Sequence, residues 1–221
     1  MLVVHHLNNS RSQRVLWLLE ELGVPYEIVP HTRHPKTDFA PPEVRKLHPL
    51  GKLPIVVDGD LVIAESGAVM EYLVETYGQG RMIPPPGSAE RLRYRYWMHY
   101  AEGSGMQPLL LKVIFDRIEA AKLPFYLKPM VRALSRGVKA SFVEPQLKLH
   151  LDFLEAELAR SEWFAGDELT AADLQMSFVV QAAAAYGGLD ETRPRLMAFQ
   201  QKIEARPAWA RSVERGGPYQ L

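Results

Sequence analysis

The feature that most limits the fold of this chain is a change of pattern close to residue 80. Before it, short apolar and β-branched runs alternate with helical patterns; after it, only helical periodicity remains. The stretch 78–88 between them is rich in glycine and proline, which is typical of a linker. The sequence therefore predicts an α/β half (residues 1–78), a linker (79–88) and an all-helical half (89–221).

The first half begins with the pattern of a strand, a helix and a second strand. Residues 2–7 form an apolar run, and residues 15–22 carry valine and leucine at the spacing of one helix face. Gly23 is expected to end this helix, and residues 26–29 form the next strand. The two strands of such a βαβ unit are expected to be parallel, with a right-handed crossover.

A loop and a hairpin complete this half. Residues 32–50 are rich in proline and charge and are expected to be mostly loop. The Asp58-Gly59 pair separates two β-branched runs, which favours a hairpin. A helix is expected from about Ser66, so the half has the order β-α-β-loop-β-β-α.

Composition excludes several kinds of chemistry. The chain has no cysteine, which excludes disulfides, thiolate metal sites and a cysteine nucleophile, so any thiol must come from a ligand. Its 26 basic and 26 acidic residues balance, which argues against nucleic-acid binding. No apolar run approaches the roughly 20 residues that span a membrane, and the start lacks a signal-peptide pattern. We expect a soluble cytoplasmic protein without a metal.

Four motifs resemble those of the cytosolic glutathione transferases. They occur in the family's order and span nearly the whole chain, which makes them specific together although each is weak alone. Residues 5–11 are similar to those of a serine-type group found in fungi and bacteria. The motifs are the first-helix segment 10–23, the loop 48–54, the acidic-serine pair Glu65-Ser66 and the buried cap 169–173.

The resemblance implies a thioredoxin-like domain that binds glutathione and an all-helical domain that binds the second substrate. The implied activity is stabilisation of the glutathione thiolate for attack on a small hydrophobic electrophile, in detoxification. Peroxidase activity on organic hydroperoxides is an additional option. The alternative is a non-enzymatic regulatory or carrier protein that binds glutathione or another ligand. A homodimer is expected, without nucleic-acid or membrane partners.

A hydroxyl at the N-terminal end of the first helix is the expected catalytic group. It would donate a hydrogen bond to the sulfur, and the helix dipole would add positive potential. Ser10 is the first choice, because it follows the first strand and matches the serine position of several classes. Asn9 and Ser12 are the alternatives. A simple helix N-cap would also explain a serine at position 10.

Five residues are expected to bind the rest of glutathione. The resemblance implies a cis peptide before Pro54, which exposes the backbone of Leu53 to the cysteinyl part of the ligand, and a contact from Lys52 to a carboxylate. Ser66, at a helix N-terminus, suits the γ-glutamyl carboxylate, and Glu65 suits the ammonium group.

One position departs from the family pattern. The basic residue that binds the glycyl carboxylate in some serine-type members falls on Ala40. Lys36, Arg33 and Lys52 are the possible substitutes.

Two further patterns lie in the helical half. Tyr96, Tyr100 and Phe115 are candidates for the hydrophobic substrate pocket, with core or dimer contacts as the other explanation. Thr170 and Asp173 form a capping-box pattern and are expected to be structural.

Overall fold

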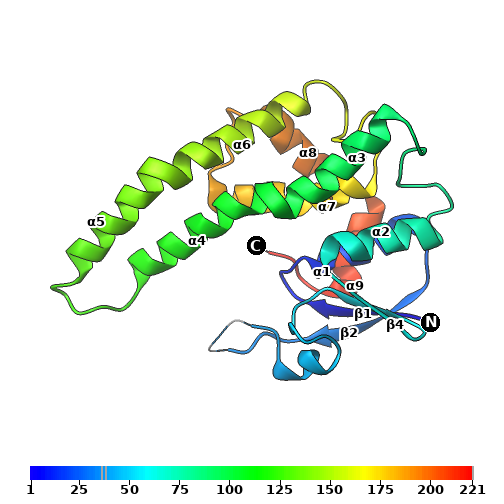
Figure 1. Ribbon diagram of the computed structural model, residues 1–221, viewed down its shortest axis with the longest axis horizontal. Coiled ribbons are helices and arrows are strands. Elements are labelled where there is room, and N and C mark those ends of the chain that lie inside the picture. The colour runs from blue at the N-terminus through cyan, green and yellow to red at the C-terminus, as the bar shows by residue number, and fades with distance from the viewer. Residues whose placement is uncertain (36, 38, 221) are drawn as a thin grey trace.

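The computed structural model describes residues 1–35, 37 and 39–220. Its α/β half contains a four-stranded sheet of order β2-β1-β3-β4 (Figure 1). β1 and β2 are parallel, whereas β1–β3 and β3–β4 are antiparallel, so the expected thioredoxin-like arrangement is confirmed. The strands are β1 (Leu2–Leu7), β2 (Tyr26–His31), β3 (Ile55–Asp58) and β4 (Leu61–Ala64).

Two helices accompany the sheet. α1 (Ser12–Leu22) connects β1 to β2 and ends at Gly23, whose φ of 68° lies in the left-handed region that glycine favours. α2 (Ser66–Tyr77) follows β4. The long loop between β2 and β3 includes one short 3-10 helix, η1 (Pro42–Lys46).

The rest of the described chain is helical, as the sequence predicts. The π-helical turns η2 and η3 join α3 to α4 and α5 to α6, and η4 follows α7. No helix in the described part is long and apolar enough to cross a membrane. The elements are α3 (Ala89–Tyr100), η2 (Ala101–Gly105), α4 (Met106–Ala120), α5 (Lys128–Val138), η3 (Lys139–Val143), α6 (Glu144–Glu157), α7 (Ala171–Ala182), η4 (Ala183–Gly187), α8 (Pro194–Glu204) and α9 (Pro207–Gly216).

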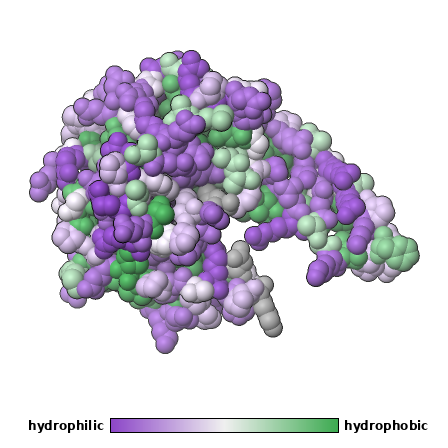
Figure 2. Space-filling view, turned by 180° about the vertical axis from the view of Figure 1, so that it is seen from behind, coloured by the Kyte–Doolittle hydropathy of each residue, from purple (hydrophilic) through white to green (hydrophobic). Residues whose placement is uncertain are grey.

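α4 and α5 form a hairpin that projects from the body of the molecule (Figure 1). Seen from behind, the hairpin leaves an open hollow between itself and the α/β half, and apolar surface appears at its tip (Figure 2). Phe125 and Tyr126 lie in the connection between the two helices and are exposed.

α1 is enclosed by both halves of the molecule. Every residue from Ser12 to Leu19 is buried, so the helix has no solvent-facing side over that stretch. Trp17 meets Trp209 of α9 edge to face, with ring centroids 5.4 Å apart. Gln13 Nε2 donates to Ser212 Oγ of α9 at 3.0 Å. One apolar core therefore runs from the sheet through α1 into the helical half.

The predicted capping box at the start of α7 is confirmed. Asp173 is fully buried and accepts from the backbone N–H of Thr170 at 2.8 Å and of Phe164 at 2.7 Å. Burial raises the pKa of the Asp173 carboxyl to about 6, although these donors oppose the shift. The carboxyl therefore fastens the loop before α7 to the helix.

We expect Asp173→Ala to lower the free energy of unfolding by about 3 kcal/mol, because it leaves two buried N–H groups without an acceptor. Urea unfolding measures the change. Asp167→Ala, at an exposed site in the same loop, is the matched control and should cost less than about 0.5 kcal/mol. Equal losses in the two variants would contradict the structural role of Asp173.

Candidate functional site

A pocket of about 1020 Å³ lies between the α/β half and the helical half. Its walls come from the end of β1, the loop before β3, the start of α2, and α4 and α7. A cavity of this size is larger than a tripeptide requires. Seven residues proposed from the sequence line this pocket: Asn9, Ser10, Lys52, Leu53, Pro54, Glu65 and Ser66.

The backbone around the pocket is unusual at two places. The Leu53–Pro54 peptide is cis, as expected. Glu65, directly before α2, has φ 72° and ψ 124°, a conformation that is strained for any residue except glycine. Such strain concentrates at functional sites. It brings the N-terminus of α2 to the pocket, where free N–H groups and the helix dipole favour an anion.

Ser10 lies between β1 and α1 and is 8% exposed, on the side of the pocket. Its Oγ accepts from the backbone N–H of Ser12 at 3.2 Å and lies 2.8 Å from Ser12 Oγ. The hydroxyl is therefore held in a fixed position at the N-terminal end of α1. The positive end of the helix dipole lies at the same place.

Ser12 has a different environment, because its side chain is fully buried and does not line the pocket. Its Oγ accepts from the Leu7 N–H at 3.0 Å and lies 2.8 Å from His6 Nδ1. His6 Nε2 lies 3.0 Å from the carbonyl oxygen of Gly216, at the end of α9. Because a carbonyl oxygen only accepts, Nε2 carries the proton and Nδ1 is an acceptor. The Ser12 hydroxyl proton therefore has two acceptors within reach, His6 Nδ1 and the carbonyl oxygen of Leu7 at 3.1 Å. Ser12 thus joins β1, α1 and, through His6, α9.

His6 is neutral in this network. Burial lowers the pKa of its imidazole to about 4, the hydrogen bond to Gly216 opposes the shift, and His31 adds to it. A Cβ at position 216 would come within 3.2 Å of His6 Nε2 and 2.6 Å of Leu16 Cδ1. Glycine at this position therefore permits the close approach of α9 to His6.

Asn9 lies at the rim of the pocket and is exposed. Its φ of 52° is left-handed, and its Oδ1 accepts from the backbone N–H of Gln220 at 2.8 Å. The backbone oxygen of Asn9 accepts from Arg33 Nη2 at 3.0 Å. Asn9 is thus tied to the C-terminal segment and to the loop after β2.

Ala40, which replaces the expected basic residue, also lines the pocket. Arg33 and Lys52, two of the proposed substitutes, line it as well. Lys36, the third, lies outside the described residues. Arg45 and His48 add two more basic side chains to this wall, which the sequence did not identify.

The helical half contributes a wall that was also missed. Glu102 of η2, Leu110 of α4 and Phe178 of α7 line the pocket, and Arg11 reaches them from the α/β half. Arg11 and Glu102 are 91 positions apart in the sequence, so no local pattern links them. In the sequence, the position of Arg11 directly after Ser10 was the one indication that Arg11 lies at the pocket.

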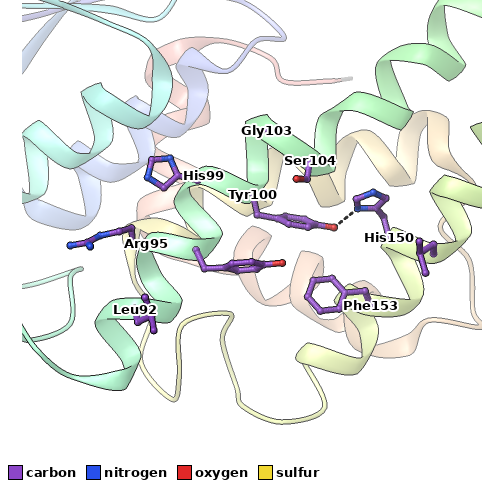
Figure 3. Close-up of a pocket in the computed structure, with 10 residues that line it drawn as sticks. Leu92, Arg95, His99, Tyr100, Gly103, Ser104, His150 and Phe153 are labelled. Carbon is purple, nitrogen blue, oxygen red and sulfur yellow. Dashed lines mark hydrogen bonds between the residues drawn. The ribbon is translucent and has the colours of Figure 1, made fainter.

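The assignment of Tyr96, Tyr100 and Phe115 to the pocket of Ser10 is not supported by the geometry. Tyr96 and Tyr100 line another cleft of about 840 Å³ between α3 and α6, in which Tyr100 Oη points to His150 Nδ1 at 2.5 Å (Figure 3). Phe115 packs against the core and lines neither cavity. The helical spacing of Tyr96 and Tyr100 places them on one face of α3. It does not show which helix packs against that face.

Two histidines lie close together on neighbouring strands. His5 Nδ1 lies 3.0 Å from His31 Nε2, and His31 is the last residue of β2. In the part of the chain that the structure describes, no three or more His, Asp or Glu residues are grouped so that they could hold a metal ion.

Comparison with known proteins gives a consistent result. Residues 1–75 match the family model for the glutathione S-transferase N-terminal domain, and residues 118–207 match that for the C-terminal domain. Glutathione S-transferase 3 of Schizosaccharomyces pombe is 37% identical over 97% of this chain and 88% of its own length. Glutathione S-transferase 1 of Saccharomyces cerevisiae is 29% identical over 96% of this chain and 94% of its own.

Solved structures agree with this. A glutathione S-transferase from Actinobacillus pleuropneumoniae has a TM-score of 0.81 and 30% identity, over 98% of this chain and 93% of that one. A glutathione transferase from Phanerochaete chrysosporium, solved in complex with oxidized glutathione, has a TM-score of 0.74 and 23% identity, over 97% and 96% of the two chains. The second likeness concerns the fold alone.

The buried His6 predicts a pH dependence of stability. Its folded-state pKa of about 4 lies below the ordinary value of 6.5, so the unfolded chain binds more protons between these values. Lowering the pH from about 7 to about 5 should therefore reduce the free energy of unfolding by about 2 kcal/mol. Urea unfolding at about pH 7 and about pH 5 measures this change. The free energy of unfolding should fall less between the two pH values in His6→Gln than in the wild type.

His99→Gln, at an exposed position, is the control and should retain the wild-type difference between the two pH values. An acid loss in His6→Gln equal to that of the wild type would show that His6 is not the source.

Proposed function

The chain belongs to the glutathione S-transferase family, and we propose that the pocket beside Ser10 binds glutathione with its sulfur at the Ser10 hydroxyl. The protein is accordingly a glutathione transferase. One observation carries the assignment of the site: a single pocket is lined by Leu53, by the N-terminus of α2 and by a hydroxyl at the N-terminus of α1. These three features match the cysteinyl backbone, the γ-glutamyl carboxylate and the thiol of the tripeptide.

Each end of the ligand has a matching group in this proposal. Ser66 and the first N–H groups of α2 receive the γ-glutamyl carboxylate, and Glu65 accepts from the ammonium group. The N–H and C=O of Leu53 pair with the cysteinyl part. The glycyl carboxylate lies toward Lys52 and Arg33, on the wall that includes Ala40. Each carboxylate of the ligand thus faces N–H groups or basic side chains, and its ammonium group faces a carboxylate.

Ser10 is the proposed thiolate ligand because it combines three properties. It lines the pocket, its position is fixed by Ser12, and it lies at the positive end of α1. The Ser12 hydroxyl is already hydrogen-bonded to Leu7 and His6, and its burial favours a structural role. In the free protein the Ser10 proton is directed to Ser12 Oγ, because the Ser12 proton has its own acceptors in His6 Nδ1 and the carbonyl oxygen of Leu7. Rotation about the Ser10 C–O bond turns the Ser10 proton to the sulfur.

In this proposal, the two halves of the chain bind different substrates. Residues 1–78 hold glutathione, residues 79–88 are the linker, and residues 89–221 hold the hydrophobic electrophile at the wall of Leu110 and Phe178. The thiolate attacks an electrophile held next to it, so catalysis combines proximity with a lowered thiol pKa. We place the protein in the cytoplasm and in detoxification, as the family resemblance implies.

We further propose a homodimer that uses the cleft between α3 and α6. The cleft is lined by Leu92, Tyr96 and Leu149, which are exposed hydrophobic residues. Exposed apolar surface that is gathered in this way marks an interaction site. A second copy of the chain would bury it.

We expect the wild type to bind glutathione saturably and to form thiolate well below the ordinary thiol pKa of about 8.5. Ser10→Ala should retain binding but lose the thiolate signal at neutral pH, because the sulfur loses its donor. Ultraviolet absorbance of the thiolate, followed during titration with glutathione, measures both quantities.

Lys52→Ala is the matched control, because it should weaken binding by about tenfold yet leave the thiolate signal at saturation. If the signal persists in Ser10→Ala and disappears in Asn9→Ala, the role belongs to Asn9. Binding without thiolate in the wild type would instead support a carrier or regulatory protein.

The dimer is tested by sedimentation. We expect a dimer of the wild type at micromolar concentration and a monomer for Leu92→Glu, because the variant places a charge in the apolar cleft. Leu134→Glu is the control, since Leu134 on α5 is 69% exposed, as is Leu92. A wild type that sediments as a monomer, or a Leu92→Glu variant that remains dimeric, would contradict this interface.

A further inference from the structure

The side chain of Arg11 crosses from the α/β half to the helical half. Its Nε donates to both carboxylate oxygens of Glu102, at 3.0 and 2.9 Å. The guanidinium carbon lies 4.8 Å from the centroid of the Phe178 ring, within the range of a cation–π contact. Two groups from different helices therefore fix the orientation of the Arg11 side chain.

Glu102 also binds a second arginine, and this sets the charge of the cluster. Arg14 Nη2 donates to Glu102 Oε1 at 2.7 Å, and its Nη1 donates to the carbonyl oxygen of Gln175 at 2.7 Å. Burial tends to raise the pKa of the Glu102 carboxyl, but Arg14 and Arg11 outweigh it and keep the pKa below its ordinary value. One carboxylate thus faces two guanidinium groups, and the cluster keeps one positive charge.

This charge is available only on the pocket side. The Arg14 side chain is 2% exposed, whereas the Arg11 side chain is 36% exposed and lines the pocket. The terminal Nη atoms of Arg11 have no acceptor among residues 1–35, 37 and 39–220. A fixed guanidinium with unused donors therefore lies next to Ser10, on the side where the apolar Leu110 and Phe178 form the wall.

We propose that Arg11 binds an oxygen atom of the electrophile and that the protein favours apolar α,β-unsaturated carbonyl compounds. This inference rests on the proposed function, in which the glutathione thiolate lies at Ser10. A guanidinium in a partly water-excluded site stabilises negative charge that develops on an oxygen during reaction. The apolar wall receives the hydrocarbon part of the same molecule.

The reaction balances without any further reagent. A lone pair of the thiolate sulfur forms the C–S bond at the β-carbon, and the C=C π pair moves to give an enolate. Its negative oxygen accepts hydrogen bonds from the Arg11 Nη donors, and Arg11 remains protonated throughout. The α-carbon then takes one proton from solvent, which replaces the proton that the thiol lost, so the product is the sum of glutathione and the carbonyl compound.

A substitution reaction places its charge elsewhere. When the thiolate displaces a halide, the negative charge leaves with the halide, and no oxygen of the electrophile needs a donor. The two reaction types should therefore depend differently on Arg11. Benzylideneacetone and benzyl chloride make a matched pair of probes, because both carry one phenyl group and differ in the group that receives the charge.

The test is kcat/KM for both probes with the purified wild type and Arg11→Met. We expect kcat/KM for benzylideneacetone to fall by about tenfold to about a hundredfold, and that for benzyl chloride to change by less than about threefold. Arg11→Lys, which keeps the charge but loses the planar fork, should lie between. Arg14 still pairs with Glu102 in these variants, and a thermal melt checks that they fold.

Arg45→Met is the control, since Arg45 lines the pocket from η1, in the loop between β2 and β3, and should change both reactions equally. Equal losses with the two probes in Arg11→Met, no loss with benzylideneacetone, or a wild type that converts only benzyl chloride would each overturn the proposal. A wild type that forms no glutathione thiolate would instead overturn the proposed function, and the ultraviolet titration distinguishes the two failures.

Discussion

The structure depends on the enclosure of residues 12–19 of α1 between the sheet and the helical half. The apolar residues of this helix face the core on every side, so its polar residues need partners within the protein. Gln13 finds Ser212 on α9, and Arg14 finds Glu102 and the backbone of Gln175. These bonds are made with the other half of the molecule. The N-terminus of α1 therefore has a fixed position only when both halves are packed together.

This constraint explains why chemistry can be concentrated at one end of α1. Ser10 and Arg11 are adjacent in the chain but face different partners. The first is held by Ser12, and the second by Glu102 and Phe178. In the proposed function, the serine serves the nucleophile and the arginine serves the electrophile. Two neighbouring residues would thus bring together substrates that are bound by different halves, and neither half would complete the site alone.

Much of the fold could be predicted because local periodicity determines local structure. The valine and leucine spacing gave α1, the Asp58-Gly59 pair gave the β3–β4 hairpin, and the box at Thr170 and Asp173 gave the start of α7. The residues that line the pocket beside Ser10 could be brought together from the sequence because short motifs hold them. The Arg11–Glu102 pair was not, since the bond spans two halves. Tyr96 and Tyr100 were misplaced for a related reason, because spacing along α3 does not identify the helix that packs against it.

The most direct test of the central claim is a crystal structure of the protein with glutathione. We expect one tripeptide in the pocket between the two halves, with its sulfur within hydrogen-bonding distance of Ser10 Oγ. We also expect the γ-glutamyl carboxylate at the start of α2 and the cysteinyl backbone against Leu53. A tripeptide bound in the cleft between α3 and α6, or one whose sulfur points away from the N-terminus of α1, would contradict that claim.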